Sequence, residues 1–220
     1  MLGLETDLSA FYRFARQDDR LNALARRFRG MRPTRFPTIF EALVNAVACQ
    51  QLSLEVGIHL LNRLAAAFGP SVPSGDGSWA AFPRPGDLAS LTPEAFRRLG
   101  FSNSKGRAVV ELARRLADQG QGSLWRLEAM SDGQAIKYLQ TFRGIGRWSA
   151  EYVLLRGLGR WHVFPGDDVG ARNKLQAWLG LPAPLDYQGV GRVLAGFHPF
   201  GGLIYFHFLL SHLAEEGYLQ

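Results

Sequence analysis

A carboxylate that could do chemistry stands at the start of a predicted helix. Asp167 and Asp168 follow the turn-forming pair Pro165 and Gly166, and an amphipathic stretch at 168–179 begins with the second Asp. One of the two should cap this helix by accepting backbone N–H bonds, which leaves the other for catalysis. A carboxylate in such a place can act as a general base or stabilise positive charge that develops during a reaction.

A turn that could hold a phosphate group lies upstream of this pair. Gly144 and Gly146 flank Ile145 between two predicted helices, and glycines allow a positive φ and a close approach of another backbone. Ile145 should pack inward, and the free N–H groups of the helix beginning near Arg147 form a natural anion site. A lone Gly-X-Gly is more often an ordinary turn, but the full pattern at 139–150, Leu-x-x-Phe-x-Gly-Ile-Gly-x-x-Ser-Ala, is far more specific. The combination indicates an enzyme that acts on nucleic acid.

Composition limits the class of protein. The chain has 220 residues, enough for one medium domain or two small lobes with a real core. Its net charge of +6 favours a polyanionic partner, although a merely basic protein would carry the same charge. Cys49 is the only cysteine, so no disulfide framework, zinc cluster or iron–sulfur cluster can be built from cysteines. The five histidines show no metal-ligand spacing.

No leader or membrane span is expected. The chain opens without a basic-then-apolar leader, and no apolar run approaches the ~18 residues that a spanning helix needs. We therefore expect no membrane partner. We also expect the protein to be a monomer. Its predicted location is the cytoplasm, associated with the nucleoid, if the source is bacterial, and otherwise the nucleus.

The spacing of the apolar residues predicts an all-α fold. Nearly every segment is amphipathic with a helical period, and 39–51 is apolar almost all round, so its helix should be central. Thr38 and Glu41 can form a capping box at its start, and Ser53 can cap the next helix. The Pro-, Gly- and Ser-rich segment 70–87 is predicted to be a loop, and either a lobe boundary or a flexible insertion.

The pattern at 139–150 resembles the helix-hairpin-helix motif of the DNA glycosylase superfamily that includes endonuclease III. Two more stretches, Ala48-Cys-Gln-Gln-Leu-Ser53 and Leu99-Gly-Phe-Ser-x-x-Lys-Gly-Arg-Ala108, resemble the alkylated-base branch, 3-methyladenine DNA glycosylase II, as does 143–168. The similarity covers roughly residues 36–210, most of the chain.

The resemblance implies a two-lobed helical fold with a central cleft. One lobe would span 37–147, with the hairpin at its end, and the N-terminal and C-terminal helices, 1–36 and 148–220, would form the other. The family's separate N-terminal β-domain is not expected, because this chain begins with helices.

The resemblance also makes Asp168 the catalytic residue, since the second Asp of this pair is catalytic in the family. Trp148 lies where endonuclease III-type lyases carry a Schiff-base lysine, and the spacing 168 − 148 = 20 is that of the alkylated-base branch. Without an amine there, the implied reaction is hydrolysis of the N-glycosidic bond of a flipped alkylated base, with no lyase step. Two alternatives stay open: a glycosylase for deaminated or mismatched bases, and a DNA-binding module without catalysis.

The implied base pocket contains Trp148 and Tyr152, which lie one helical turn apart and share a face. A cationic base would stack well on such rings, although core packing is the commoner role of an aromatic pair. The family's pocket tryptophan aligns here with Leu209, or near Phe206 and Phe208 if the register slips. The pocket should therefore be more open than in the family.

The implied partner is double-stranded DNA that contains damaged bases. Leu52 matches the residue that intercalates into the duplex, and a leucine packed at a helix end is an equal alternative. The predicted DNA-contacting residues are Leu52, Gln51, Ser104, Lys105, Arg107, Gly144, Gly146, Arg147 and Lys174. Any one of the cationic side chains could instead belong to a solvated charged face.

A monovalent cation is the one metal that the resemblance suggests. In the family the hairpin offers backbone carbonyls to such an ion, which bridges to a DNA phosphate. Here the carbonyls of Phe142 and Ile145 would bind Na⁺ or K⁺. No cofactor is required by the expected reaction, and no iron–sulfur cluster is expected.

Overall fold

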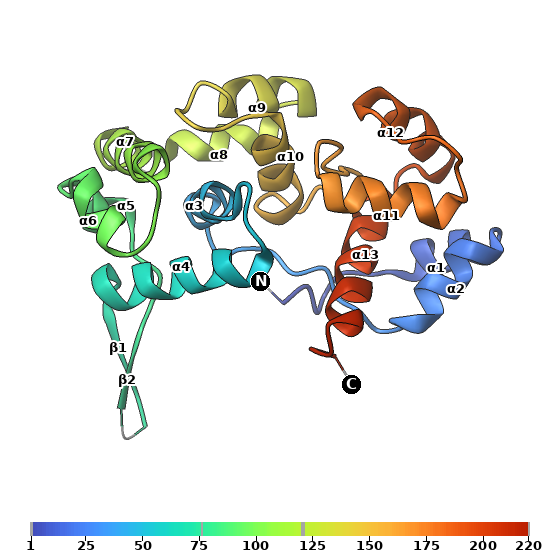
Figure 1. Ribbon diagram of the computed structural model, residues 1–220, viewed down its shortest axis with the longest axis horizontal. Helices are drawn as coiled ribbons and strands as arrows, with labels where there is room; N and C mark the ends of the chain where they lie inside the picture. Colours follow the sequence, from blue (N-terminus) through green and yellow to red (C-terminus); the bar gives the residue numbers. More distant parts are fainter. Residues whose placement is uncertain (1, 76, 120–121, 220) are drawn as a thin grey trace. The chain divides into compact units, whose positions relative to one another are not determined.

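The structure of the chain, a computed structural model, describes residues 2–75, 77–119 and 122–219. Helices dominate it, which confirms the predicted all-α class (Figure 1). In chain order the elements are α1 (Ser9–Ala15), α2 (Asp19–Arg27), α3 (Ile39–Cys49), α4 (Leu54–Phe68), β1 (Ser71–Ser74), β2 (Gly77–Ala80), α5 (Pro85–Ala89), α6 (Pro93–Arg98), α7 (Asn103–Gln119), α8 (Gly122–Ala129), α9 (Asp132–Leu139), α10 (Arg147–Arg156), α11 (Val169–Leu179), α12 (Tyr187–Leu194), the 3₁₀ helix η1 (Ala195–Phe197) and α13 (Gly201–Glu215).

The chain divides into two compact units. The terminal unit comprises Met1–Arg35 and Leu154–Gln220, and the central unit comprises Phe36–Val153. The division falls inside α10, so the hairpin before this helix belongs to the central unit and the Asp167–Asp168 pair after it to the terminal unit.

Helix α3 forms the middle of the central unit. Thr38 caps it by accepting the N–H of Glu41 at 3.0 Å, without the return bond from Glu41 that the expected capping box would add. Buried apolar side chains cover most of the helix, and Glu41, Asn45 and Cys49 form one half-buried stripe along it. Helices α4 and α7 pack against α3, and α5 and α6 pack against α7. Because α3 ends at Cys49, the chain reaches the surface at residues 50–53, where Ser53 accepts the N–H of Val56 and starts α4.

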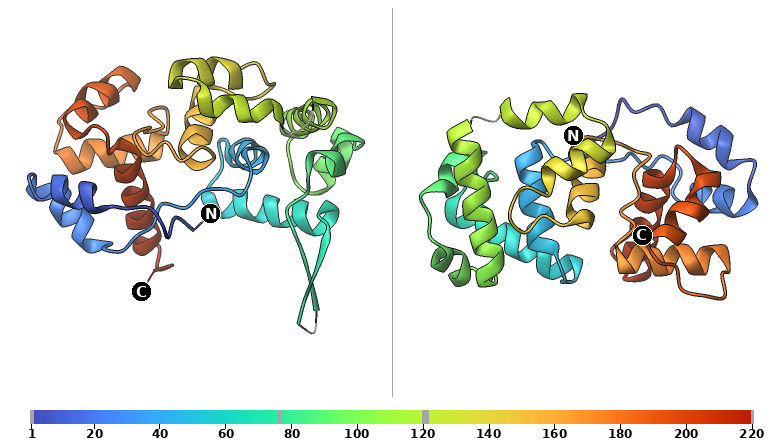
Figure 2. Two further views of the ribbon diagram at one scale, coloured as in Figure 1. Left: turned by 180° about the vertical axis from the view of Figure 1, so that it is seen from behind. Right: turned by 90° about the horizontal axis from the view of Figure 1, so that it is seen from above.

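The predicted loop at 70–87 is wrong in part. Strands β1 and β2 pair antiparallel, with Val72 opposite Trp79, and project from the central unit beyond the end of α4 (Figures 1 and 2). Gly75, with φ +54°, supplies the left-handed backbone that tight hairpin turns require. The short strands escaped the sequence analysis because both are solvent-exposed on both faces where described, and so show no alternation of apolar and polar residues. The segment lies inside one unit, so it is no boundary.

The core of the terminal unit is built around α13. Residues 201–208 of this helix are all buried, against Phe11 of α1, Leu21 of α2 and Leu175 of α11. Helices α11 and α13 pack against each other (Figure 1). Asp168, which precedes α11, is hydrogen-bonded to Tyr205 in the second turn of α13. In the described part of the chain no single helix is long and apolar enough to cross a membrane. One pair of helical segments, Tyr187–Phe197 and Gly201–Glu215, has together the length and the apolar composition of a membrane span, but the pair is bent by 106°.

Candidate active site

Asp168 is held at the N-terminus of α11 by two donors. Its Oδ1 accepts the backbone N–H of Ala171 at 2.9 Å, as an N-cap does, and its Oδ2 accepts the hydroxyl proton of Tyr205 at 2.8 Å. The N-cap is therefore Asp168 itself, and the expectation that the other Asp of the pair would serve as the cap is wrong. The extended backbone of Asp168 is typical of an N-cap residue. One side chain is thus both the cap of α11 and the candidate catalytic carboxylate.

A cavity of about 170 Å³ opens beside this carboxylate in the terminal unit. Helices α11 and α13 supply its walls, which are formed by Asp168, Gly170, Ala171, Lys174, Tyr205, Phe208, Leu209 and His212. Leu209 thus lies where the sequence places a pocket residue. Phe206 does not line the cavity: it is buried in the core, with its ring 5.9 Å from that of Trp161 and under the guanidinium of Arg156 at 5.1 Å.

The aromatic pair predicted from the i, i+4 spacing exists in the central unit. The rings of Trp148 and Tyr152 stack, with centroids 5.4 Å apart and planes 28° from parallel. The Tyr152 hydroxyl donates to Oδ1 of Asn45 on α3 at 2.8 Å, which fixes the position of its ring. Both side chains are only half-buried, unlike the neighbouring apolar residues of α10, so core packing does not account for the whole of either ring.

The hairpin between α9 and α10 has one glycine that the backbone requires and one that it does not. Gly144 has φ +77°, and a Cβ there would lie 3.0 Å from the Cβ of Ala108. Gly146 has no positive φ, and a Cβ there would meet nothing within 4 Å. The side chains of Phe142 and Ile145 are buried, as expected for Ile145, whereas Gly146 and Arg147 are exposed.

The turn between α3 and α4 displays Leu52, which is 41% exposed. Just before it, Gln51 has φ +56°, and it is the one non-glycine residue with a positive φ in the described part of the chain. A left-handed backbone costs an ordinary L-residue about 1–2 kcal/mol, so the surrounding structure must hold it. Leu52 is therefore not the buried helix-end leucine of the alternative interpretation.

Lys105 has a different place from the one the sequence predicts. Instead of pointing away as a phosphate contact, its ammonium donates to the carbonyls of Ala48 at 2.8 Å and Gln50 at 2.7 Å. Partial burial lowers the pKa of this lysine. A cation on the last carbonyls of α3 also interacts favourably with the helix dipole. Local patterns could not reveal this role, because the lysine and its acceptors lie more than fifty residues apart.

The other predicted phosphate contacts differ in their surroundings. Ser104, Arg107 and Arg147 are exposed, the first two in the first turns of α7 and the third at the start of α10. Lys174 is half-buried and pairs with Glu215, Nζ to Oε2 at 2.7 Å. The hydrogen bond from Lys174 is the main cause of a lowered pKa at Glu215. Lys174 is thus the least available of these cations for DNA.

Two residues that the sequence analysis missed belong to this site. Tyr205 orients Asp168 from 37 positions away, and Gln50 joins the α3–α4 turn to the hairpin. Gln50 belongs to the stretch Ala48-Cys-Gln-Gln-Leu-Ser53 that carries the family resemblance, but the sequence pattern does not distinguish Gln50 from Gln51. Tyr205 has no signal in the sequence beyond its place in an apolar helix.

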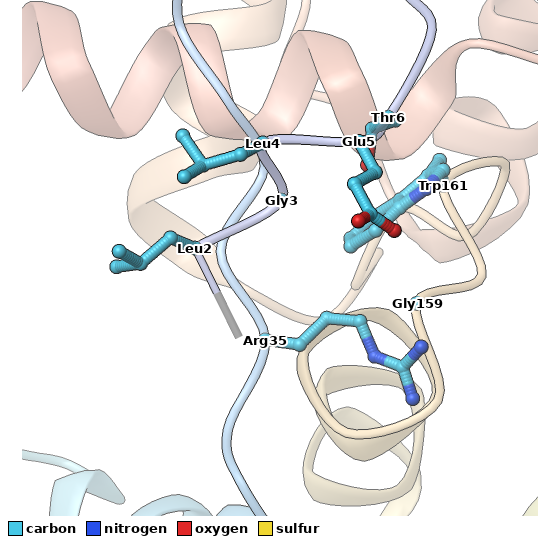
Figure 3. Close-up of a pocket in the computed structure, with 8 residues that line it drawn as sticks. All are labelled: Leu2, Gly3, Leu4, Glu5, Thr6, Arg35, Gly159 and Trp161. Carbon is cyan, nitrogen blue, oxygen red and sulfur yellow. The ribbon is translucent and has the colours of Figure 1, made fainter.

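A larger cavity elsewhere in the terminal unit lacks the predicted chemistry. It has a volume of about 640 Å³ and is lined by Leu2, Gly3, Leu4, Glu5, Thr6, Arg35, Gly159 and Trp161 (Figure 3). Arg35 already donates from Nε and Nη2 to the carbonyl of Gly157, at 3.2 and 2.9 Å. None of the predicted site residues lines this cavity, so the Asp168 cavity is the candidate active site.

The arrangement around Asp168 suits the stabilisation of a cation. A carboxylate fixed by two donors at the edge of a small, mostly apolar cavity needs no reorganisation when positive charge develops beside it. Across the described residues, no group of three or more His, Cys, Asp or Glu side chains could hold a metal ion.

Comparison with known proteins identifies the family. Residues 44–192 match the family described as HhH-GPD superfamily base excision DNA repair protein. The chain belongs to this family. A Bacillus subtilis (strain 168) relative named DNA-3-methyladenine glycosylase is 36% identical over 173 residues, which are 79% of this chain and 57% of that protein. The chain thus spans little more than half the length of this relative.

Solved structures of the family share the fold. The 3-methyladenine DNA-glycosylase from Archaeoglobus fulgidus superposes with a TM-score of 0.82 at 28% identity, covering 94% of this chain and 70% of that one. Schizosaccharomyces pombe 3-methyladenine DNA glycosylase (Mag1), in complex with abasic DNA, gives a TM-score of 0.75 at 26% identity and covers 91% and 95%. The family and fold predicted from the sequence are therefore confirmed.

Proposed function

We propose that this chain is a monofunctional DNA glycosylase that removes alkylated bases of the 3-methyladenine and 7-methylguanine type from double-stranded DNA in base excision repair. One observation carries the proposal: Asp168 stands beside a small cavity with both carboxylate oxygens oriented by donors. Membership of the family and the names of the Bacillus, Archaeoglobus and Schizosaccharomyces relatives, all for 3-methyladenine, support it.

In the proposed reaction the enzyme takes the damaged base out of the stack before the bond breaks. As the N-glycosidic bond lengthens, the sugar gains oxocarbenium character, and the Asp168 carboxylate stabilises this charge and orients or deprotonates the attacking water. An N-alkylated purine leaves readily because it already carries a positive charge. One carboxylate can therefore suffice without a general acid.

No lyase step is part of the proposal. A lyase needs a desolvated amine that attacks the sugar and forms a Schiff base. The corresponding position holds Trp148, whose ring instead stacks with Tyr152. We assign this pair to the reception of the flipped cationic base, since the electron-rich faces of both rings attract a cation. Leu52, exposed on its left-handed corner, would fill the gap that the base leaves in the duplex.

The hairpin would bind the DNA backbone, and the donor set there suits a monovalent cation. Backbone carbonyls alone are the ligands that Na⁺ and K⁺ accept and that transition metals avoid. The carbonyls of Phe142 and Ile145 would hold the ion, and the ion would supply a positive charge between the hairpin and a DNA phosphate. Gly146 and Arg147, both exposed, offer further contacts at the start of α10.

The test is the release of free base from methylated duplex DNA, with each base identified by chromatography. Wild-type protein should release alkylated purines, and the Asp168→Asn variant should release none while it still binds DNA. Release by both proteins would contradict the assignment of Asp168. If neither releases an alkylated base although both bind DNA, the same assay on duplexes with hypoxanthine or a mismatch decides between a different lesion and a binding module without catalysis.

A further inference from the structure

The side chain of Gln50 joins two parts of the central unit that are far apart in sequence. Its Nε2 donates to the carbonyl of Gly144 in the hairpin at 2.7 Å and to Oγ of Ser149 in the first turn of α10 at 2.8 Å. A carbonyl oxygen can only accept, so the orientation of the amide is determined, and both of its N–H donors are used. Ser149 is 1% exposed, and Gln50 supplies a partner to this buried hydroxyl.

The backbone of Gln50 is held by Lys105. The ammonium group, in the first turns of α7, donates to the carbonyls of Gln50 and Ala48 and closes the end of α3. A single residue is thus fixed by both its main chain and its side chain, to two different helices. Such fixation explains how the next residue, Gln51, keeps a positive φ without being a glycine.

The consequence concerns Leu52. It follows directly on the fixed corner, and its own N–H reaches back to the carbonyl of Cys49 at 3.4 Å. Its apolar side chain is partly exposed to solvent, whereas many other leucines of the protein are buried in the core. A loop that is already ordered pays no conformational entropy when its tip enters a partner, whereas a mobile loop would pay for several residues.

We propose that Gln50 and Lys105 are positioning residues that fix the position of Leu52 relative to the phosphate-binding hairpin. The hairpin can then bind the DNA backbone at the same time as Leu52 enters the base stack. The inference rests on the proposed function, because it takes Leu52 as the wedge and Gly144 to Arg147 as the backbone contact. Neither Gln50 nor Lys105 touches the reacting atoms in this scheme. Each acts through the turn at 50–53.

Two substitutions remove the connection at either end. Gln50→Glu keeps the shape but replaces two N–H donors with a carboxylate oxygen that faces the carbonyl of Gly144. Lys105→Met keeps the stem and removes the ammonium. Matched controls are Gln17→Glu, in the exposed turn between α1 and α2, and Lys137→Met, on the exposed side of α9. Should Gln50→Glu not fold, Gln50→Met, which has neither donor nor charge, takes its place.

The first readout needs no catalysis. A duplex with a tetrahydrofuran abasic analogue and a neighbouring 2-aminopurine reports on insertion, because fluorescence rises when the analogue's neighbour loses its stacking. At saturating protein we expect a clear rise with wild type and with both controls. Leu52→Ala, Gln50→Glu and Lys105→Met should each lose most of the rise. A full wild-type response in both positioning variants would overturn the proposal, as would the absence of any response in wild type.

The second readout separates positioning from general damage to the fold. Single-turnover release of alkylated purines should fall about tenfold or more on duplex DNA in Gln50→Glu and Lys105→Met, since small misplacements are costly in rate. On the same DNA as denatured single strands, release should change far less. Equal losses on both substrates would show a merely structural role and refute the proposal.

The two readouts also keep the proposed function and this inference apart. If wild type released no base but the fluorescence rise were present and lost in the two variants, the positioning role would stand and the glycosylase activity would fail. If wild type released base and the variants kept both the fluorescence rise and the duplex rate, the activity would stand and the positioning role would fail.

Discussion

The hydroxyl of Tyr205 donates a 2.8 Å hydrogen bond to Oδ2 of Asp168, from a helix that begins 33 positions after that carboxylate (201 − 168 = 33). The other oxygen, Oδ1, accepts the N–H of Ala171 within α11 itself. Two donors from two helices therefore define the plane of the carboxylate. In the proposed reaction this plane faces the sugar, and its orientation matters as much as its charge.

The first prediction separates charge from orientation. Asp168→Asn should lower the rate of base release at least about 100-fold, because an amide neither stabilises a cation nor accepts a proton. Since Asn caps helices as well as Asp does, the fold should survive. Tyr205→Phe keeps the ring and removes the donor, so kcat should fall about tenfold, in line with a hydrogen bond to a charged group.

Single-turnover rates and DNA affinities of the wild type and the two variants are the measurements. The affinity for a duplex with an abasic analogue should stay at the wild-type value in both, because neither change touches the hairpin. A wild-type rate in Tyr205→Phe would show that the capping bond alone orients Asp168.

The second prediction uses the difference between the two hairpin glycines. Gly144→Ala forces a side chain into a left-handed backbone and towards Ala108, so the free energy of unfolding should drop by about 1–2 kcal/mol. Gly146→Ala meets nothing within 4 Å and has no positive φ, so stability should be retained. If Gly146 is there to let a phosphate approach the backbone, its variant should nevertheless bind DNA more weakly.

Urea unfolding and titration of a labelled duplex test this pair of variants. Gly133→Ala, another open glycine, on α9 and outside the hairpin, is the matched control and should leave DNA binding unchanged. Wild-type affinity in Gly146→Ala would mean that no DNA group comes near this position.

Local sequence patterns predicted those features that local physics decides. The apolar period gave the helical class, and the caps at Thr38 and Ser53 form as expected, because a cap involves residues only three apart. The position of the Asp167–Asp168 pair at a helix start was within reach for the same reason, because a Pro-Gly turn before a helix restricts where a carboxylate can stand, whereas the choice of Asp168 as catalytic came from the family resemblance and stays a prediction. The Trp148–Tyr152 stack follows from the i, i+4 rule alone.

The parts that could not be predicted are tertiary hydrogen bonds between polar side chains and distant backbone. Lys105 was predicted to contact DNA, since nothing near it in sequence shows that the end of α3 lies within reach of its ammonium group. Gln50 and Gly144 are 94 positions apart. The strands β1 and β2 stayed hidden for a different reason, because an exposed ribbon needs no apolar alternation.

The third prediction concerns the salt dependence of DNA binding. Each true phosphate contact contributes about 0.9 to the slope of log K against log salt. Arg107→Ala should therefore reduce the slope by about one unit if this exposed side chain contacts a phosphate. Lys174→Ala should leave the slope unchanged, because Glu215 already holds the ammonium at 2.7 Å.

Dissociation constants for one duplex over a series of salt concentrations give these slopes. Glu215→Gln provides the reverse test. Because the substitution removes the negative charge that pairs with Lys174, this lysine becomes available to a DNA phosphate, and the salt slope should equal or exceed that of wild type. A loss of one unit in Lys174→Ala would restore this lysine to the list of phosphate contacts and show that the ion pair opens on binding.

The last prediction is a pH dependence of stability that arises at His207. This side chain is 0% exposed, its Nδ1 donates to the carbonyl of Leu203 at 2.7 Å, and its buried Nε2 has no hydrogen-bond partner among the described residues. Burial lowers the pKa of His207, and the hydrogen bond to Leu203 offsets only part of the shift. Protonation in the folded state would place a charge beside the rings of Phe11 and Phe28.

The sign follows from the two protonation states. The unfolded chain takes up the proton near pH 6.5, whereas the folded chain does so only at lower pH, so the stabilisation from a neutral His207 is complete above about pH 6.5 and is lost as pH falls below it. The loss can reach about 1.4 kcal/mol per pH unit in that window. His207→Phe, which suits an aromatic site, removes this term, so its free energy of unfolding should fall less than that of wild type between pH 7 and pH 5. Urea unfolding at several pH values gives the free energy of unfolding as a function of pH for wild type and for His207→Phe, and the other histidines contribute equally to both. Parallel curves would contradict the prediction, because they would show that His207 accepts its proton in the folded state as readily as in the unfolded one.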